Sequence, residues 1–365
     1  MSLKEQLLTP LVSAGHTFRN RVVMAPMSRR RSTNGVPAAS APLYYSQRAG
    51  AGLIIAENTA VAANGVGYLN APGIYNTAQK TAWKNVTDAV HAREGKIFLQ
   101  LVHTGRIGHP LNNEGGALLV APSAVTAAET IRVPGDLHLP MPQPEVLSTE
   151  GVREMIAAHI QAAISAIEVG FDGVEIHGAH GFLPEQFLHP HTNKRTDEYG
   201  GSIVNRSRFL LEIMEGVVAA IGKERTGIRL SPFATLNDLP LYEEEAATHQ
   251  YVIDALQQLG ILYIHLSDQS SNGNPPIPVE FIRDVRQRFH HLLILAGGYT
   301  AASAEAMLQS GLADLIAFGR PFIANPDLVE RFRYQAALNE EDKATFYEGG
   351  DKGYIDYPVS FLARD

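Results

Sequence analysis

Two histidines three residues apart, His177 and His180, directly follow the apolar run that begins at Gly173. An imidazole at the end of a buried strand can donate a hydrogen bond to a substrate oxygen or bind a metal ion. A metal would require a third ligand, for which Glu175 and His189 are candidates. A carbonyl, nitro or phenolate oxygen needs only the two donors. We favour oxygen binding, with a metal site and a structural role as the alternatives.

Glycines and arginines at three other strand ends indicate a bound anion. Gly297 and Gly298 follow the run LLILA, and Gly319 and Arg320 follow LIAF. Glycine turns let backbone N–H groups approach a phosphate closely, and an arginine adds a charge-assisted donor. Arg229 lies inside an apolar run and therefore needs an anionic or electron-rich partner. The alternative is that each glycine only opens a tight turn.

Eight short apolar runs, rich in β-branched residues, supply these strand ends. They begin near Val22, Leu53, Lys96, Gly173, Gly227, Ile261, Leu292 and Leu315. Such runs are typical of parallel strands buried on both faces. Amphipathic segments of helical length lie between most of them, at 77–93, 149–169, 204–221, 243–259, 279–289 and 301–309. The alternation predicts one α/β domain over residues 1–365, a (β/α)8 TIM barrel. A doubly wound sheet is disfavoured because no G-x-G-x-x-G follows any strand.

The interval 105–148, after the third strand, is rich in proline and glycine and has little periodicity. It is too long for an ordinary connection between a strand and a helix. We therefore predict an excursion that contains a small hairpin and caps the mouth of the barrel. Catalytic groups of such barrels lie at that mouth.

Composition excludes several classes of protein. The 365 residues carry a formal net charge of −8 and contain no cysteine. Disulfides, thiolate zinc sites, iron–sulfur clusters and cysteine nucleophiles are thus excluded. No basic stripe is available for nucleic acid, and no apolar run reaches the ~18 residues that span a bilayer. Residues 1–10 contain no signal-peptide run, so we expect a cytoplasmic protein without a membrane or nucleic-acid partner.

The stretch HGAHGFLPEQFLHPHTNKRTDEYGGSIVNRSRF, at 177–209, closely resembles the signature region of the old yellow enzyme family. Further matching stretches are NRVVMAPMSR (20–29), VGYLNAPGIY (66–75), LQLVHTGRIGHP (99–110), RLSPF (229–233), FGRPFIANPDL (318–328) and TFY…GYIDYP (345–358). They follow the family's order over almost the whole chain. The likeness is nearest to the N-ethylmaleimide reductases and the pentaerythritol tetranitrate reductase-like enzymes.

The resemblance implies a TIM barrel that binds FMN tightly but non-covalently. It implies NADPH or NADH as reductant and a small activated alkene, quinone or nitro compound as oxidant, reduced by ping-pong hydride transfer in a monomeric enzyme. The flavin-binding positions that match are Pro26, Met27, Ser28, Asn58, Gln100, His177, Arg229, Gly297, Gly298, Gly319, Arg320 and Phe346. The catalytic pair would be His177 and His180, which hold the oxygen of the oxidant, and no metal is implied. Tyr68 and Tyr347 would border the substrate.

Two departures from the family pattern concern the substrate side. Phe182 occupies the position where most members have the tyrosine that gives a proton to the substrate α-carbon, and a phenyl ring cannot donate. Val102 stands where many relatives have a tryptophan beside the substrate, so we expect a roomier pocket. The proton would then come from water or from another hydroxyl such as that of Tyr75. A metal-dependent barrel hydrolase and a flavin-binding protein with attenuated catalysis remain as alternatives.

Overall fold

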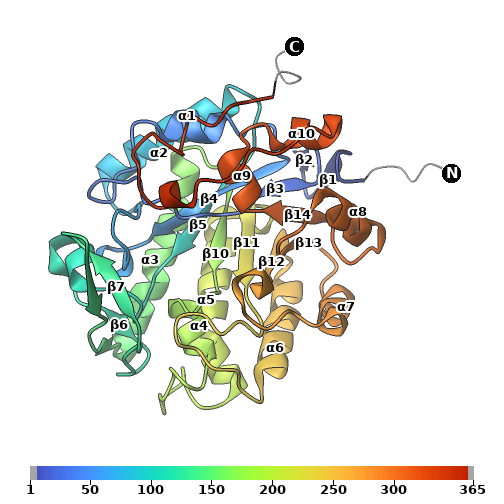
Figure 1. Cartoon of the computed structure of the whole chain (residues 1–365). Helices are drawn as coiled ribbons and strands as arrows, with labels where there is room; N and C mark the ends of the chain where they lie inside the picture. The colour runs from blue at the N-terminus through green and yellow to red at the C-terminus, as the bar shows by residue number, and fades with distance from the viewer. Residues whose placement is uncertain (1–5, 361–365) are drawn as a thin grey trace.

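The eight predicted strands form a closed parallel barrel (Figure 1). The computed structural model describes residues 6–360. The barrel strands are β3 (Val22–Met24), β4 (Leu53–Ala60), β5 (Ile97–Val102), β10 (Gly173–His177), β11 (Thr226–Leu230), β12 (Tyr263–Ser267), β13 (Leu292–Ala296) and β14 (Leu315–Phe318). Neighbours follow chain order, and β14 pairs with β3 to close the ring. The prediction of a (β/α)8 barrel is confirmed.

Helices surround this barrel, and every predicted helix is present within three residues of its expected ends (Figure 1). They are α1 (Ala41–Ser46), α2 (Thr77–His91), α3 (Thr149–Glu168), α4 (Leu183–Leu188), α5 (Ile203–Ile221), α6 (Glu245–Leu259), α7 (Val279–Arg288), α8 (Ala301–Gln309), α9 (Arg320–Ala324) and α10 (Leu328–Tyr334). The side chain of Ser148 accepts from the N–H of Gly151 and caps α3, as the sequence suggests. The short helices α1, α4, α9 and α10 were not predicted because one or two turns show no clear period.

Side chains alternate along each strand between the helix layer and the barrel interior. The lower part of the interior is apolar, and Val23, Leu53, Phe98, Tyr263 and Leu292 belong to one buried cluster there. On the four adjacent strands β5, β10, β11 and β12 the next inward positions towards the carboxyl ends are polar, namely Gln100, Glu175, Arg229 and His265. On the other strands they stay apolar, as at Ile55 and Ile294. The fold therefore places an apolar floor under a polar site.

An unpredicted hairpin adds to the floor of the barrel. It consists of β1 (Leu11–Ser13) and β2 (His16–Phe18), paired antiparallel. Phe18 is buried in the same cluster as the barrel interior, and the ring of His16 lies 5.8 Å from that of Phe98. Each strand has only three residues, which is too few for alternation to be read from sequence. The sequence predicts no signal peptide in residues 1–10, and residues 1–5 of that segment lie outside the described residues.

The predicted excursion after the third barrel strand contains the expected hairpin. Its strands β7 (Thr130–Val133) and β8 (Leu137–Pro140) pair antiparallel, while β6 (Val120–Ala121) and β9 (Glu145–Val146) form a short parallel pair. Figure 1 shows β6 and β7 at one side of the barrel, beyond α3. Ile131 and Val133 share a buried cluster with Phe182, so the hairpin packs over part of the barrel mouth.

No helix within residues 6–360 is long and apolar enough to cross a membrane. The longest, α3, carries the charged side chains of Glu150, Arg153, Glu154 and Glu168 along its length.

Four buried histidines predict that the fold loses stability in acid. Burial lowers the pKa of His103 to about 3, and those of His159, His189 and His249 to about 4. Unfolded histidines protonate near pH 6.5, so the unfolded chain takes up these protons first as pH falls. The histidine contribution to stability is thus present above pH 6.5 and decreases towards pH 4.

Two buried carboxyl groups oppose this effect without cancelling it. Burial raises the pKa of Glu185 to about 8 and that of Glu245 to about 7, so the folded state binds their protons first. With these four histidines against these two carboxyl groups, the unfolded chain binds roughly one proton more than the folded chain around pH 6, so we expect the unfolding free energy to fall by roughly 1–2 kcal/mol between pH 6.5 and 5.5. Urea unfolding at pH 6.5, 6.0 and 5.5 measures this slope, and equal midpoints would contradict it.

Candidate active site

A cavity of about 630 Å³ opens at the carboxyl ends of the barrel strands. All but one of the sequence-predicted site residues line it: Pro26, Met27, Ser28, Asn58, Tyr68, Gln100, His177, His180, Phe182, Arg229, Gly297, Gly298, Gly319, Arg320, Phe346 and Tyr347. They come from seven barrel strands or the loops that follow them and from the C-terminal segment. The barrel thus brings residues more than 300 positions apart into one cavity.

A buried charged cluster forms the base of the cavity. Glu175 and His265 are fully buried, and the Glu175 carboxylate accepts from Gln100 Nε2 at 2.7 Å and bonds to His265 Nδ1 at 2.9 Å. Arg229 stands between His177 and His265 in the strand register. Its pKa is lowered by burial, partly offset by the charge of Glu175, and its Nε has no hydrogen-bond partner. The cluster presents an unsatisfied cationic donor to the cavity.

The two histidines of the predicted pair are brought together at the top of β10. Their ring centroids are 5.0 Å apart with the planes at 81°. His180 adopts a left-handed conformation with φ 60°, which few non-glycine residues adopt. Its Nε2 lies 2.9 Å from Ser267 Oγ, and its backbone N–H donates to Ser231 Oγ. This turn is fixed by neighbours on β11 and β12.

The histidine pair is neutral at physiological pH. Burial, and next the positive charge of Arg229, hold the pKa values of both imidazoles well below 6.5. A neutral imidazole carries one N–H donor. His177 Nδ1 is buried and has no partner. The pair can therefore donate hydrogen bonds to an oxygen without carrying positive charge.

The residues proposed as a third metal ligand are directed elsewhere. Glu175 is held by Gln100 and His265, and His189 Nε2 lies 2.7 Å from the carbonyl oxygen of Pro240. No three His, Cys, Asp or Glu side chains are grouped to hold a metal ion anywhere in the described part of the chain. The geometry supports the oxygen-binding interpretation of the pair.

The glycine loops after β13 and β14 form the wall opposite the histidines. A Cβ on Gly297 would lie 2.8 Å from the Cβ of Asp268, and Gly298 has φ 71°, so both positions require glycine. Arg320 begins α9, and its Nη2 donates to the side chain of Asn272. Gly297, Gly298, Gly319 and Arg320 thus line the same cavity, which is what a phosphate site at these glycine turns would require.

Ser28 and Asn58 contact each other within the cavity wall. The Ser28 hydroxyl donates to Asn58 Oδ1, which links the end of β3 to β4. The family resemblance implies that both residues contact the flavin ring but does not indicate that they pair. Arg29, which follows Ser28, is turned away from the cavity and donates to the carbonyl oxygen of Gly353 at 2.6 Å.

Aromatic rings form the substrate side of the cavity. The ring of Phe182 lies 5.0 Å from His177 and 6.1 Å from Tyr68, in both cases edge to face. Burial raises the pKa of Tyr68 to about 12, so its hydroxyl keeps its proton. Tyr347 is half exposed at the rim, and Phe346 lies beside it in the lining.

Two residues named from the sequence lie outside the lining of the cavity. Val102 does not line the cavity, because the hairpin of the excursion covers it and leaves it 2% exposed beside Phe182 and Ile131. Tyr75 is also outside the lining, and burial raises the pKa of its hydroxyl to about 12. Tyr68 is instead the tyrosine in contact with Phe182.

Several lining residues were missed. Asp268, Gln269, Ser271, Asn272, Tyr299 and Arg30 also line the cavity. Asp268 and Gln269 directly follow β12, so the strand-end rule that found the other residues applies to them equally. Arg30 follows a matched motif and carries no local signal of its own.

The residues present fit a flat, electron-rich cofactor that ends in a phosphate. Arg229 Nε is a buried donor without a partner at the base, and the Gly297–Gly298 cradle has no room for a Cβ at its first position. The FMN implied by the resemblance has these features.

Comparison with known proteins agrees with this fit. Residues 6–339 match the model of the family described as NADH:flavin oxidoreductase / NADH oxidase. The chain is 40% identical to 12-oxophytodienoate reductase 7 of Oryza sativa subsp. japonica over 372 residues, which cover 96% of this chain and 94% of that protein. It is 39% identical to a probable flavin mononucleotide-dependent alkene reductase of Leishmania infantum, covering 96% and 97%.

Solved structures give the same result. Morphinone reductase superposes with a TM-score of 0.95 at 44% identity and covers 100% of this chain and 99% of its own. The old yellow enzyme homologue from Zymomonas mobilis superposes with a TM-score of 0.92 at 38% identity, covering 97% and 99%. The similarity extends over the complete barrel and its mouth.

Proposed function

The chain belongs to the NADH:flavin oxidoreductase / NADH oxidase family, that of the old yellow enzymes, and we propose that it reduces enones, maleimides, quinones or nitro compounds. It is an FMN-dependent ene-reductase that uses NADH or NADPH. The observation that carries the substrate class is the neutral pair His177 and His180 at the top of the cavity. Two uncharged donors suit the carbonyl or nitro oxygen of an activated alkene.

FMN supplies reversible two-electron chemistry when it is bound. Gly297, Gly298, Gly319 and Arg320 would hold its phosphate, and Arg229 would lie against the ring where negative charge gathers. The second group of ring contacts is Pro26, Met27, Ser28, Asn58, Gln100 and Phe346. Glu175 holds Gln100 and balances Arg229, so it positions both side chains for that ring.

The histidine pair activates the oxidant. Donation from His177 and His180 to the substrate oxygen draws electron density away from the conjugated carbon–carbon bond. The β-carbon then becomes a better electron acceptor. Because the site is buried, these hydrogen bonds face little competition from water.

A flavin-binding protein with attenuated catalysis is the second candidate, and Phe182 favours it. That ring contacts His177 at the position of the family's proton donor and has no proton to give. Family membership decides against the metal-dependent hydrolase. Anaerobic NADPH or NADH should bleach the yellow holoenzyme, and 2-cyclohexenone should restore the colour. A yellow protein that neither nucleotide bleaches would support the second candidate.

Arg229→Met is expected to weaken FMN binding by about 10- to 100-fold, because it removes a charge-assisted donor at a buried position. The Kd of FMN for apoprotein, followed by quenching of flavin fluorescence, measures this loss. Arg225→Met is the matched control, since Arg225 is exposed just before the other end of β11. Equal Kd values for both variants would contradict the role of Arg229. Thermal unfolding of the apoproteins would reveal any damage from removing the positive charge that faces Glu175.

A further inference from the structure

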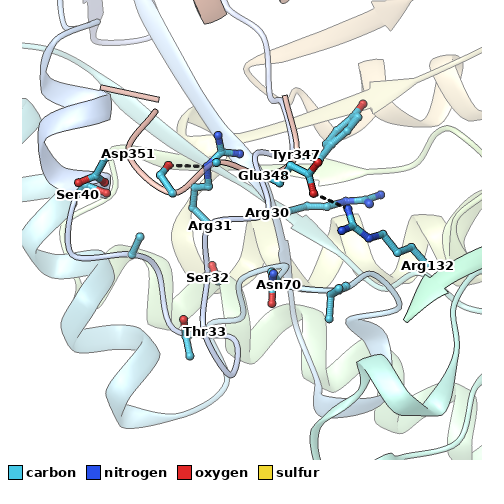
Figure 2. A pocket seen from close by; sticks show the side chains of 14 residues that line it. Arg30, Arg31, Ser32, Thr33, Ser40, Asn70, Arg132, Tyr347, Glu348 and Asp351 are labelled. Atoms are coloured by element: carbon cyan, nitrogen blue, oxygen red, sulfur yellow. Dashed lines mark hydrogen bonds and ion pairs between the residues drawn. The ribbon is translucent and has the colours of Figure 1, made fainter. Parts of the chain in front are cut away.

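A second cavity of about 300 Å³ adjoins the active site and shares Arg30 and Tyr347 with its lining (Figure 2). We name it the arginine chamber, defined by Arg30, Arg31, Arg132, Tyr347 and Glu348. Its residues come from the loop after β3, from the hairpin strand β7 and from the C-terminal segment. Figure 2 shows the side chains of Arg30 and Arg132 reaching towards the same end of this chamber.

Two of the three arginines already have partners. Arg31 donates to the carbonyl oxygens of Gly350 at 2.9 Å and Thr345 at 2.6 Å, which fastens the C-terminal segment. Arg132 forms ion pairs with Asp136 at 2.8 Å and Glu348 at 2.9 Å. Neither side chain is available as an unpaired cation.

Arg30 differs from both. Its side chain forms no hydrogen bond or ion pair within residues 6–360, and its buried Nε has no partner. The guanidinium lies 4.9 Å from the ring centroid of Tyr68 and 4.7 Å from that of Tyr347. Burial, and also the nearby charge of Arg132, lowers the pKa of Arg30. It nevertheless stays charged at neutral pH, because the ordinary pKa of a guanidinium lies far above 7.

An unpaired, partly buried cation is unfavourable, and two aromatic faces offset only part of that cost. The N–H donors of a guanidinium suit the geometry of a phosphate or carboxylate. Arg30 also stands where the chamber meets the cavity that holds the histidine pair. A molecule that extends from one cavity into the other would pass beside it.

We propose that Arg30 binds an oxyanion, a phosphate or carboxylate, on a molecule whose reacting end lies at the histidine pair. This proposal rests on the proposed function. Two sources carry that chemistry: a phosphate of the pyridine nucleotide, or an acidic side chain of the oxidant. In either case the chamber selects a ligand by its charge, at a distance from the reacting atoms.

Glu348 allows a second test of the proposal, because removal of its negative charge should have the opposite effect on anion binding to removal of the positive charge of Arg30. Its carboxylate pairs with Arg132 and lines the same chamber, so it repels an incoming anion. Arg30→Met should therefore weaken anion binding, whereas Glu348→Gln should strengthen it. Arg153→Met on α3 is the control for a lost surface arginine, because Arg153 is exposed and lines neither cavity.

The first measurement uses oxidised holoenzyme without reductant, so it records binding alone. Titration calorimetry compares a cyclopentenone that carries a heptanoate side chain with its uncharged methyl ester. If the oxidant is the source, Arg30→Met should raise the Kd of the acid by about 10- to 100-fold more than that of the ester. Glu348→Gln should lower the Kd of the acid relative to the ester.

The second measurement examines the coenzyme. Stopped-flow reduction of FMN at increasing NADPH or NADH gives an apparent Kd for each nucleotide. If the extra phosphate of NADPH is the anion, Arg30→Met should raise its Kd by about 10- to 100-fold more than that of NADH. If Arg30 binds a phosphate common to both nucleotides, Arg30→Met should raise the Kd of NADPH and that of NADH alike. The ratio of the Kd of the acid to that of the ester should then be the same in the variant as in the wild type.

The proposal would be overturned if Arg30→Met changed the Kd values of the acid, the ester, NADPH and NADH no more than Arg153→Met does. FMN content and melting temperature of each variant show whether the fold is intact, and Arg30→Gln serves where Arg30→Met is unstable. Failure of the wild-type protein to be reduced by either nucleotide would instead contradict the proposed function. The calorimetric comparison of acid and ester stays interpretable in that case.

Discussion

His180→Ala is expected to slow reoxidation of the reduced flavin by 2-cyclohexenone about 100- to 1,000-fold, the usual loss when one donor to a developing oxyanion is removed. The imidazole is neutral and held by Ser267, so its donor is in place before the substrate arrives. Anaerobic stopped-flow absorbance at the oxidised flavin band measures the rate. Reduction by NADPH provides the internal comparison, because no negative charge develops on a substrate oxygen in that step.

A conservative variant separates hydrogen bonding from loss of shape. His180→Asn keeps an N–H donor, and asparagine tolerates the left-handed backbone of position 180 better than other residues do. It should recover most of the rate, whereas alanine should not. Phenol should also give a long-wavelength charge-transfer band with the oxidised flavin, weakened in His177→Ala. Loss of turnover on adding a metal chelator would contradict this account of the pair.

The barrel and most of its site were predictable because both depend on local signals. Strands buried on two faces must be apolar throughout, so a polar residue at or beyond their carboxyl ends stands out. His177 and Arg229 were found in this way, and the register places them side by side. Gly297 and Gly298 were found because a close approach of backbone to a ligand requires glycine.

Val102 and Tyr75 lie outside the lining of the cavity for a shared physical reason. Val102 has the same parity as Gln100 on β5, so the strand pattern directs both inward. The hairpin then covers Val102, and its position depends on packing between segments about 30 residues apart. Tyr75 lies close in sequence to Tyr68, but only Tyr68 reaches the cavity. Sequence spacing does not determine which side of a loop faces a ligand.

The arginine chamber could not be predicted from the sequence, because it depends on contacts between residues that are far apart in the chain. Arg31 and Thr345 bond across 314 positions, and Arg132 and Glu348 across 216. Only the closed barrel shows which of the three arginines is left without a hydrogen bond or an ion pair among the described residues. The unpaired charge of Arg30 is thus a property of the fold and of no local motif.

Phe182→Tyr is expected to accelerate the reduction of 2-cyclohexenone, by up to about 100- to 10,000-fold where proton transfer is limiting. Enone reduction adds a proton at the α-carbon, and the native phenyl ring cannot give one. A phenol has a pKa of about 10, whereas water as an acid has a pKa near 15.7. A tyrosine placed 5.0 Å from His177, ring to ring, would supply the missing general acid.

A nitroalkene separates this effect from a general improvement of the site. Its reduction can stop at a stable nitronate anion, so no proton is needed at carbon and Phe182→Tyr should leave that rate almost unchanged. Tyr68→Phe is the companion variant, because Tyr68 lines the cavity and packs edge-on against Phe182. If Phe182→Tyr changes neither rate while Tyr68→Phe slows only the enone, Tyr68 already donates the proton. Equal acceleration of both substrates by Phe182→Tyr would contradict the assignment, since a general acid cannot assist a reaction that takes no proton.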